Sequence, residues 1–243
     1  MKIAVIGGGA AGFMAAITAK ENNPLSNVTI FEKSNKLLVK VKISGGGRCN
    51  VTNATFSISQ LIKNYPRGGR ELKKSFNHFF TTDTVKWFES RSVILKTESD
   101  NRMFPSTNSS QTIVDLLLNT AENLSIRLSY KSKISAIIPI KNGINLCTNG
   151  KTLTFDKVII ASGGVQNENG LDWLKKIGYK IISPVPSLFT FNMPKNPITK
   201  LMGLSVDNVT TSIKGSKLKQ TGPLLITHWG MSGPAILKLS AWG

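Results

Sequence analysis

The pattern of apolar and polar residues divides most of the chain into alternating strands and helices. Short apolar runs predict strands, and apolar residues three or four positions apart predict helices that bury one face. The strands expected in this way are Lys2–Ile6, Val28–Phe31 and Val158–Ala161. The helices expected are Phe13–Lys20, Thr84–Ser90, Ser109–Asn123 and Leu171–Ile177. This alternation predicts an α/β fold with a parallel sheet, in which the wholly apolar run Val158–Ala161 is a buried strand.

Two further regions have the pattern of antiparallel β-structure. Residues 126–155 contain β-prone runs separated by Lys141-Asn142-Gly143 and Thr148-Asn149-Gly150-Lys151, which predict hairpin turns in a β-meander. Residues 188–227 are rich in proline and turn residues and contain β-prone runs, so we expect a mostly β region there. Beyond it, Ser232-Gly233-Pro234 predicts a helix start, with Ser232 as the cap and Pro234 in the first turn.

A glycine-rich turn joins the first expected strand to the first expected helix. It has the sequence Gly7-Gly8-Gly9-Ala10-Ala11-Gly12, which is the spacing of a dinucleotide-binding fingerprint. In such a turn Gly7 allows the tight bend, Gly9 lets the backbone approach a pyrophosphate, and Gly12 lets the helix pack closely on the strand. The N–H groups at the helix start would then face the phosphates.

An acidic residue follows the second expected strand at the position that a ribose-binding carboxylate occupies. Glu32 lies twenty positions after Gly12 and directly after Phe31. Its negative charge disfavours a ribose that carries a 2′-phosphate, so NAD or FAD is preferred to NADP at this site.

A second glycine-rich loop, Ser44-Gly45-Gly46-Gly47-Arg48-Cys49-Asn50-Val51-Thr52-Asn53, starts shortly after Glu32. Three successive glycines leave backbone N–H groups uncovered by side chains, which suits an anion or a flavin. Arg48 can offer a fork of donors to a phosphate or a carbonyl-rich ring. Asn50 can both donate to and accept from a flavin edge.

This loop, together with three later motifs, resembles the HI0933-like (YhiN/BaiN-type) flavoproteins, a family of NAD(P)/FAD-dependent oxidoreductases. The later motifs are Arg102-Met103-Phe104-Pro105, Ile159-Ile160-Ala161-Ser162-Gly163-Gly164 and Thr227-His228-Trp229-Gly230-Met231-Ser232-Gly233-Pro234. The chain departs from the family pattern in two places. Leu38 stands where the family usually has a glycine, and residues 165–170 replace a Ser/Thr-Gly-Asp-Gly segment.

The resemblance implies a Rossmann-like FAD-binding domain of the glutathione-reductase type over residues 1–187, with a β-meander. It implies the start of an inserted, mostly β substrate domain over residues 188–243. Because family members continue further, we expect the chain to be truncated at its C-terminus. The resemblance also implies that the second glycine loop lines the FAD near its pyrophosphate and flavin ring.

The expected site residues fall into two groups. Two residues are candidate proton donors: His228, which could instead be structural, and Cys49, whose pKa the charge of Arg48 would lower unless the thiol is simply a buried apolar group. No metal site is expected from the spacing of the two cysteines, Cys49 and Cys147. The expected cofactor-binding residues are Gly7, Gly9, Ala10, Ala11, Gly12, Glu32, Lys33, Lys40, Ser44, Gly45, Gly46, Gly47, Arg48, Cys49, Asn50, Ala161, Ser162 and Gly163.

The function that these motifs predict is an FAD-dependent oxidoreductase that transfers hydride between reduced flavin and an electron-poor C=C bond or similar acceptor. NADH or NADPH is the expected electron donor, and the sequence does not choose between them. Three alternatives stay open for the activity. They are reduction of uridine in ribosomal RNA to dihydrouridine, reduction of an aliphatic or steroid-like enone, and flavin binding without catalysis.

Composition indicates the class of protein and the cellular compartment to expect. The 243 residues are 40% hydrophobic, which is typical of a globular protein, and no apolar run approaches the length of a membrane span. The chain begins with the fingerprint strand, so a signal peptide is not expected. Two cysteines provide no disulfide framework, and we therefore expect a cytoplasmic protein with no membrane partner.

The formal net charge of +18 favours either a polyanionic partner such as RNA or a general bias toward lysine. A local basic cluster contains Arg67, Arg70, Lys73 and Lys74, which we treat as a hypothetical phosphate-binding group. Phe76, Phe79 and Phe80 follow it at helical spacing, so we expect them to form the buried face of a helix.

Overall fold

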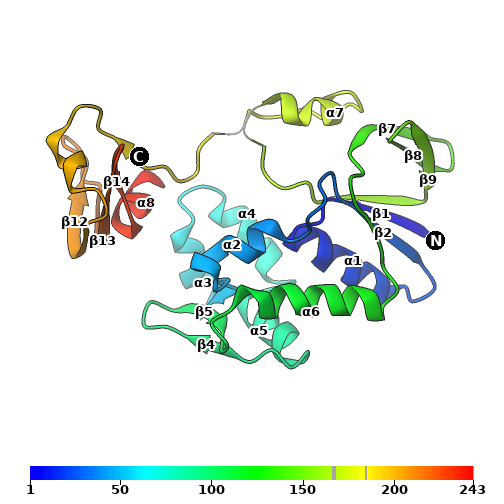
Figure 1. The fold of residues 1–243 in the computed structure, drawn as a ribbon, viewed down its shortest axis with the longest axis horizontal. Helices are drawn as coiled ribbons and strands as arrows, with labels where there is room; N and C mark the ends of the chain where they lie inside the picture. The colour runs from blue at the N-terminus through cyan, green and yellow to red at the C-terminus, as the bar shows by residue number, and fades with distance from the viewer. Residues whose placement is uncertain (166–167, 184, 243) are drawn as a thin grey trace. The chain divides into compact units, whose positions relative to one another are not determined.

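A computed structural model of the chain describes residues 1–165, 168–183 and 185–242 (Figure 1). The chain forms two compact units, which we describe separately. The first unit comprises Met1–Ile62 and Arg70–Ile182. The second comprises Lys63–Gly69 and Ser183–Gly243, so a short early segment belongs with the C-terminal part of the chain.

A four-stranded parallel sheet forms the centre of the first unit. Its strands, in the order β10-β1-β2-β6, are Lys157–Ile160, Lys2–Ile6, Asn27–Phe31 and Arg127–Ser129. The three predicted strands are thus confirmed as neighbours in one parallel sheet. The expectation that Val158–Ala161 is buried is wrong, because β10 lies at the sheet edge and leaves Ile160 41% exposed.

Helices cover one face of this sheet and the β-meander covers the other. Alternate residues of a strand point to opposite faces, so Ile3 and Val5 join the helix-side core while Ala4 and Ile6 join the meander-side core. On the helix side, α1 (Ala10–Asn22) contacts α6 (Ser110–Asn123), which runs beside it in Figure 1, and α2 (Val39–Gly47) contacts α6 in turn.

The β-meander consists of β7 (Ile134–Ile140), β8 (Gly143–Thr148) and β9 (Lys151–Phe155), and both predicted hairpin turns are confirmed. Ile137, Leu146 and Phe155 of these strands pack against Ala4, Ile6 and Phe31 of the parallel sheet. Residues 127–129, which the sequence placed in the same β-rich region, join the parallel sheet instead.

A small antiparallel sheet and several short helices complete the first unit. The sheet has the order β3-β5-β4, with strands Thr52–Asn53, Arg102–Pro105 and Leu95–Thr97. The helices are α3 (Ile58–Leu61), α4 (Gly69–Phe76), α5 (Thr81–Glu89), η2 (Glu168–Leu171) and α7 (Asp172–Lys175). The short helix η1 (Ile62–Asn64) lies at the boundary, because Lys63–Gly69 belong to the second unit. Helix α4 ends at Phe76, and therefore Phe79 is 46% exposed rather than part of one buried face with Phe80.

The second unit is mostly β, as the sequence indicates. Its antiparallel sheet has the order β11-β14-β13-β12, with strands Phe191–Asn192, Gly230–Ser232, Lys219–Thr227 and Ser205–Ser212. The helical elements are η3 (Pro197–Leu201) and α8 (Pro234–Ser240), and α8 packs on β13. Pro234 lies in the first turn of α8 as predicted, but Gly233, not Ser232, is the cap, because Ser232 still belongs to β14.

Within the described residues, none of the helices combines the length and the apolar character that crossing a membrane requires.

Candidate functional site

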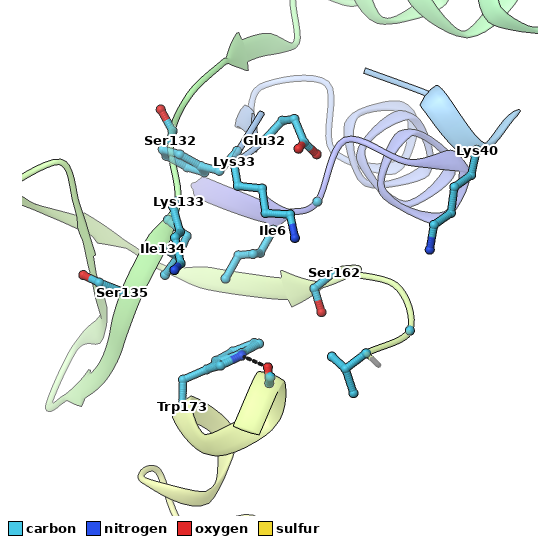
Figure 2. Close-up of a pocket in the computed structure, with 15 residues that line it drawn as sticks. Ile6, Glu32, Lys33, Lys40, Ser132, Lys133, Ile134, Ser135, Ser162 and Trp173 are labelled. Carbon is cyan, nitrogen blue, oxygen red and sulfur yellow. Dashed lines mark hydrogen bonds between the residues drawn. The ribbon is translucent and has the colours of Figure 1, made fainter. Parts of the chain in front are cut away.

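A cavity of about 800 Å³ opens at the carboxyl ends of β1, β2 and β10 (Figure 2). Open α/β sheets bind their ligands at this edge. Five of the expected cofactor residues line the cavity: Gly7, Glu32, Lys33, Lys40 and Ser162. The structure therefore brings together residues that lie up to 155 positions apart in the sequence.

The glycine fingerprint shapes the wall of the cavity at the end of β1. Gly7 has a φ of +116°, and a Cβ there would overlap the carbonyl oxygen of Ala161. A Cβ on Gly12 would overlap the carbonyl oxygen of Gly7, so the predicted close packing of helix on strand at Gly12 is confirmed, and the positive φ of Gly7 agrees with the predicted tight bend. A Cβ on Gly9 would have no described heavy atom within 4 Å, which leaves open space in front of the helix start.

The N-terminus of α1 faces that open space with its backbone. Gly9 precedes the helix in an extended conformation and accepts the first helical hydrogen bond, from the N–H of Phe13, at 3.0 Å. Ala10 and Ala11 follow and are exposed. Helix starts present unpaired N–H groups and a partial positive charge, both of which suit a phosphate.

Glu32 is held in place at the end of β2 by two backbone donors. The N–H of Gly8 donates to Oε2 and the N–H of Ser34 to Oε1, each at 2.9 Å. Burial opposes ionisation of this carboxyl, but the donors from Ser34 and Gly8, with the charge of Lys33, outweigh burial and lower its pKa. The carboxylate is therefore ionised near neutral pH and can accept hydrogen bonds from ribose hydroxyls.

Sequence reasoning missed Gly8, which supplies one of these two donors and lies close against Glu32. A Cβ there would overlap the side chain of Leu37 and lie 3.1 Å from the Cβ of Glu32. The only signal for it in the sequence was the additional glycine between Gly7 and Gly9.

The start of the β-meander supplies a further wall that the sequence did not predict. Lys131 and Ser132 donate backbone hydrogen bonds to the carbonyl oxygens of Ser34 and Glu32, each at 2.8 Å. These bonds bring Ser132, Lys133, Ile134 and Ser135 to the cavity beside the end of β2. No local motif marks residues that reach a site through tertiary hydrogen bonds.

The second glycine loop begins one helical turn beyond the cavity. Lys40 lines the cavity from α2, and Ser44 follows four residues later, a helical rise of about 6 Å. Regular helical geometry ends at Ser44, and Gly45, Gly46 and Gly47 have φ values of 57°, 68° and 83°. Residues 44–50, all of them described, are not part of the lining of this cavity.

The same loop is anchored to strand β5. The guanidinium carbon of Arg48 lies 4.1 Å from the ring centroid of Phe104, and Nη1 of Arg48 pairs with Glu98 at 2.5 Å. A Cβ on Gly45 would lie 2.9 Å from the Phe104 ring. Asn50, with its amide oriented to donate, reaches the carbonyl oxygen of Met103 at 3.2 Å. The glycine loop and the Arg102–Pro105 motif thus form one assembly.

A family model described as the HI0933-like protein Rossmann domain matches residues 1–232. The chain belongs to this HI0933-like family. It is 25% identical over 247 residues to a 3-dehydro-bile acid delta(4,6)-reductase of Clostridium scindens, a match that covers 98% of this chain and 59% of that protein. It is 26% identical over 247 residues to a ribosomal RNA dihydrouridine synthase of Escherichia coli, covering 98% and 60%. The chain therefore spans about three fifths of the length of these relatives.

The fold is the Rossmann-like FAD-binding fold. A flavocytochrome c3 fumarate reductase in its open conformation superposes with a TM-score of 0.59 at 17% identity, over 85% of this chain and 46% of that one. The parallel sheet with its antiparallel additions, expected from the sequence, is confirmed.

The candidate proton donors of this HI0933-like chain lie in different surroundings. Cys49 is 7% exposed and packs in the helix-side core, where burial raises the pKa of its thiol more than the Ser44 hydroxyl lowers it. The expectation of a buried apolar Cys49 is confirmed. The alternative, that Arg48 lowers the pKa of the thiol, is wrong, because the Arg48 guanidinium is directed to Glu98 and Phe104. His228 belongs to the second unit, exposed in the turn between β13 and β14.

The remaining expected cofactor residues, Ala161, Ser162 and Gly163, directly follow β10. Ala161 donates its N–H to the carbonyl oxygen of Ile6 at 2.9 Å, Ser162 lines the cavity, and Gly163 has a φ of 75°. Gln166 and Asn167, where the chain departs from the family pattern, lie outside the described residues.

Two alanine substitutions separate the packing role of the fingerprint from its binding role. We expect Gly12→Ala to lower the free energy of unfolding by about 3 kcal/mol or more, since the methyl group meets backbone that cannot move aside. Gly9→Ala should change it by less than about 1 kcal/mol, since the methyl enters open space, yet weaken FAD binding. Urea denaturation followed by FAD titration checks both, and equal destabilisation would contradict the assignment.

A second set of variants ranks the contacts that hold the glycine loop. Phe104 is fully buried, so Phe104→Ala should lower the free energy of unfolding by about 3–5 kcal/mol. Glu98→Gln should cost about 1 kcal/mol or less, because the ion pair is partly exposed. Phe104→Leu, the control that keeps apolar bulk without the ring, should cost less than Phe104→Ala because it leaves a smaller cavity. If Glu98→Gln proved as costly as Phe104→Ala in urea denaturation, the ion pair rather than the ring would anchor the loop.

Proposed function

We propose that the protein is an FAD-dependent oxidoreductase that transfers hydride to an electron-poor C=C bond. The observation that supports this most directly is the cavity at the strand ends, which is lined by Gly7 and by the ionised carboxylate of Glu32. Two residues after Gly7, Gly9 borders open space directly before the start of α1. These features suit a dinucleotide with an unmodified ribose. The open space at Gly9 is where a side chain would otherwise block a pyrophosphate.

The residues present fit FAD better than a nicotinamide dinucleotide. Gly7–Gly12 and the start of α1 would hold the pyrophosphate, and Glu32 would hold the ribose. Lys40 lines the cavity four residues before the second glycine loop begins, so it can contribute positive charge to the phosphates. The exposed glycines 45–47 would then face the flavin, as the family resemblance implies.

When bound, FAD supplies two-electron chemistry through its flavin ring. The protein must then provide a proton for the reduced substrate. Cys49 keeps its proton at neutral pH because burial raises the pKa of the thiol, and His228 is exposed to solvent. Both residues therefore stay candidate donors, with NADH or NADPH as the proposed source of electrons.

The names of the relatives support reduction of a C=C bond. A delta(4,6)-reductase of 3-dehydro-bile acids and a dihydrouridine synthase both name saturation of a C=C bond conjugated to a carbonyl group. We therefore propose an enone-like small molecule as the first substrate class for the protein that contains this chain.

The test of this proposal uses the visible spectrum of the purified protein. We expect the absorbance of oxidised flavin after reconstitution with FAD, and bleaching by NADH or NADPH without oxygen. Glu32→Ala should weaken FAD binding by roughly tenfold or more, since two ribose hydroxyls lose a charged acceptor. A flavin that binds but is never reduced would favour the non-catalytic alternative, and a protein that takes up no FAD would overturn the proposal.

Ribosomal RNA is a second candidate substrate, favoured by the charge of the second unit. This unit has one acidic residue, Asp207, among its described residues. Its basic residues are all exposed, and they are Lys63, Arg67, Lys195, Lys200, Lys214, Lys217, Lys219 and Lys238. Two of them, Lys214 and Lys217, lie in the turn that joins β12 to β13, and Lys219 directly after it is the first residue of β13.

Neutralising that turn tests the RNA candidate. Replacing Lys214, Lys217 and Lys219 with glutamine should make the slope of log affinity against log salt for single-stranded RNA less negative by roughly 2. The control replaces Lys141, Lys151 and Lys176 of the first unit, which removes the same charge elsewhere. Equal effects of the two sets, measured by fluorescence anisotropy, would mean that only the total charge matters.

A further inference from the structure

Trp173, on α7, lines the cavity at the carboxyl ends of β1, β2 and β10 (Figure 2). Its side chain is half-buried, and it packs against the meander-side core, which contains Ile6 and Phe31. The indole therefore has one part held by the protein and another part available to the cavity. A second aromatic residue, Phe31, also lines the cavity, but it is only 3% exposed.

The orientation of the indole is fixed by its polar group. Nε1 of Trp173 donates to the carbonyl oxygen of Gly170 at 3.0 Å, three residues earlier in the chain. Buried or half-buried tryptophan normally needs such a partner for its N–H. Because that need is met by the chain itself, the ring carbon atoms are free to contact a ligand.

The lining of the cavity is divided by chemistry. Glu32, Lys33, Lys40 and Lys133 are charged, whereas Ile6, Ile134 and Trp173 offer apolar surface. A nucleotide has the same division, since its phosphates and ribose are polar and its base is a flat aromatic ring. Flat bases bind to aromatic side chains by stacking, whatever their hydrogen-bonding pattern.

We propose that Trp173 contacts the adenine base of the dinucleotide and sets the affinity of the cavity for it. This rests on the proposed function, because it takes the ligand to be a dinucleotide held at Gly9 and Glu32. The alternative is that Trp173 serves only the core beneath it, in which case removal of the ring would cost stability but leave nucleotide affinity unchanged.

The test uses ADP and two variants of the full chain. ADP contains adenine but no flavin, so any change in indole emission comes from contact rather than from energy transfer to a flavin. Trp173→Phe keeps an aromatic ring and Trp173→Leu keeps only apolar volume. Both lose the hydrogen bond to Gly170, so their difference isolates the ring.

We expect ADP to change the tryptophan emission of the wild-type protein and to leave that of Trp173→Phe unchanged. By calorimetry, Trp173→Phe should bind ADP within about threefold of the wild type, and Trp173→Leu about tenfold to a hundredfold more weakly. Thermal denaturation without ligand shows whether both variants are folded.

Two outcomes overturn the inference in distinguishable ways. If FAD binds, as judged by its visible spectrum, but Trp173→Leu and Trp173→Phe bind ADP equally well, Trp173 has only a packing role and the proposed function stands. If the wild-type protein binds neither FAD nor ADP, both the inference and the proposed function fail.

Discussion

The close approach of α1 to β1 is the contact on which the rest of the first unit depends. It exists because Gly12 has no side chain where the carbonyl oxygen of Gly7 lies. This approach directs the start of the helix at the strand ends and allows Phe13 and Ile17 to reach the core. Had the helix packed farther from the strand, the space in front of Gly9 would not be bordered by helix N–H groups. One missing methyl group thus determines both the core and the site.

The second glycine loop and the Arg102–Pro105 motif are far apart in the sequence but pack against each other. Met103 and Phe104 serve the loop by supplying a carbonyl acceptor and a buried ring against which Gly45 and Arg48 rest. The short β3-β5-β4 sheet is therefore a support for the loop, and its small size suffices because Phe104 is completely buried. The electrostatic pair of Arg48 with Glu98 adds orientation at the surface, where water weakens its energy.

The sequence predicted the parts of the fold that local chemistry controls. The strand, glycine turn, helix and Glu32 follow one another along the chain, so their spacing was enough, and α6 was predicted from its apolar period. What sequence alone could not predict depends on tertiary contacts. Lys133 and Trp173 reach the cavity through the docking of the meander and α7, and the shift in the pKa of Cys49 depends on burial and on where Arg48 points.

Leu38, which directly precedes α2, combines a strained backbone with a buried side chain. Its backbone is left-handed, with a φ of 55°, although its side chain is 1% exposed and lies in the helix-side core. Such a conformation costs a leucine about 1–2 kcal/mol, and burial of the side chain contributes about 1.5–3 kcal/mol in return. In the unfolded chain the side chain of Leu38 is exposed to water, so no burial energy offsets the conformational cost of the left-handed backbone. The bend that leads into α2 and the glycine loop is therefore stable only while the core encloses Leu38, so loosening of that core would also release the bend.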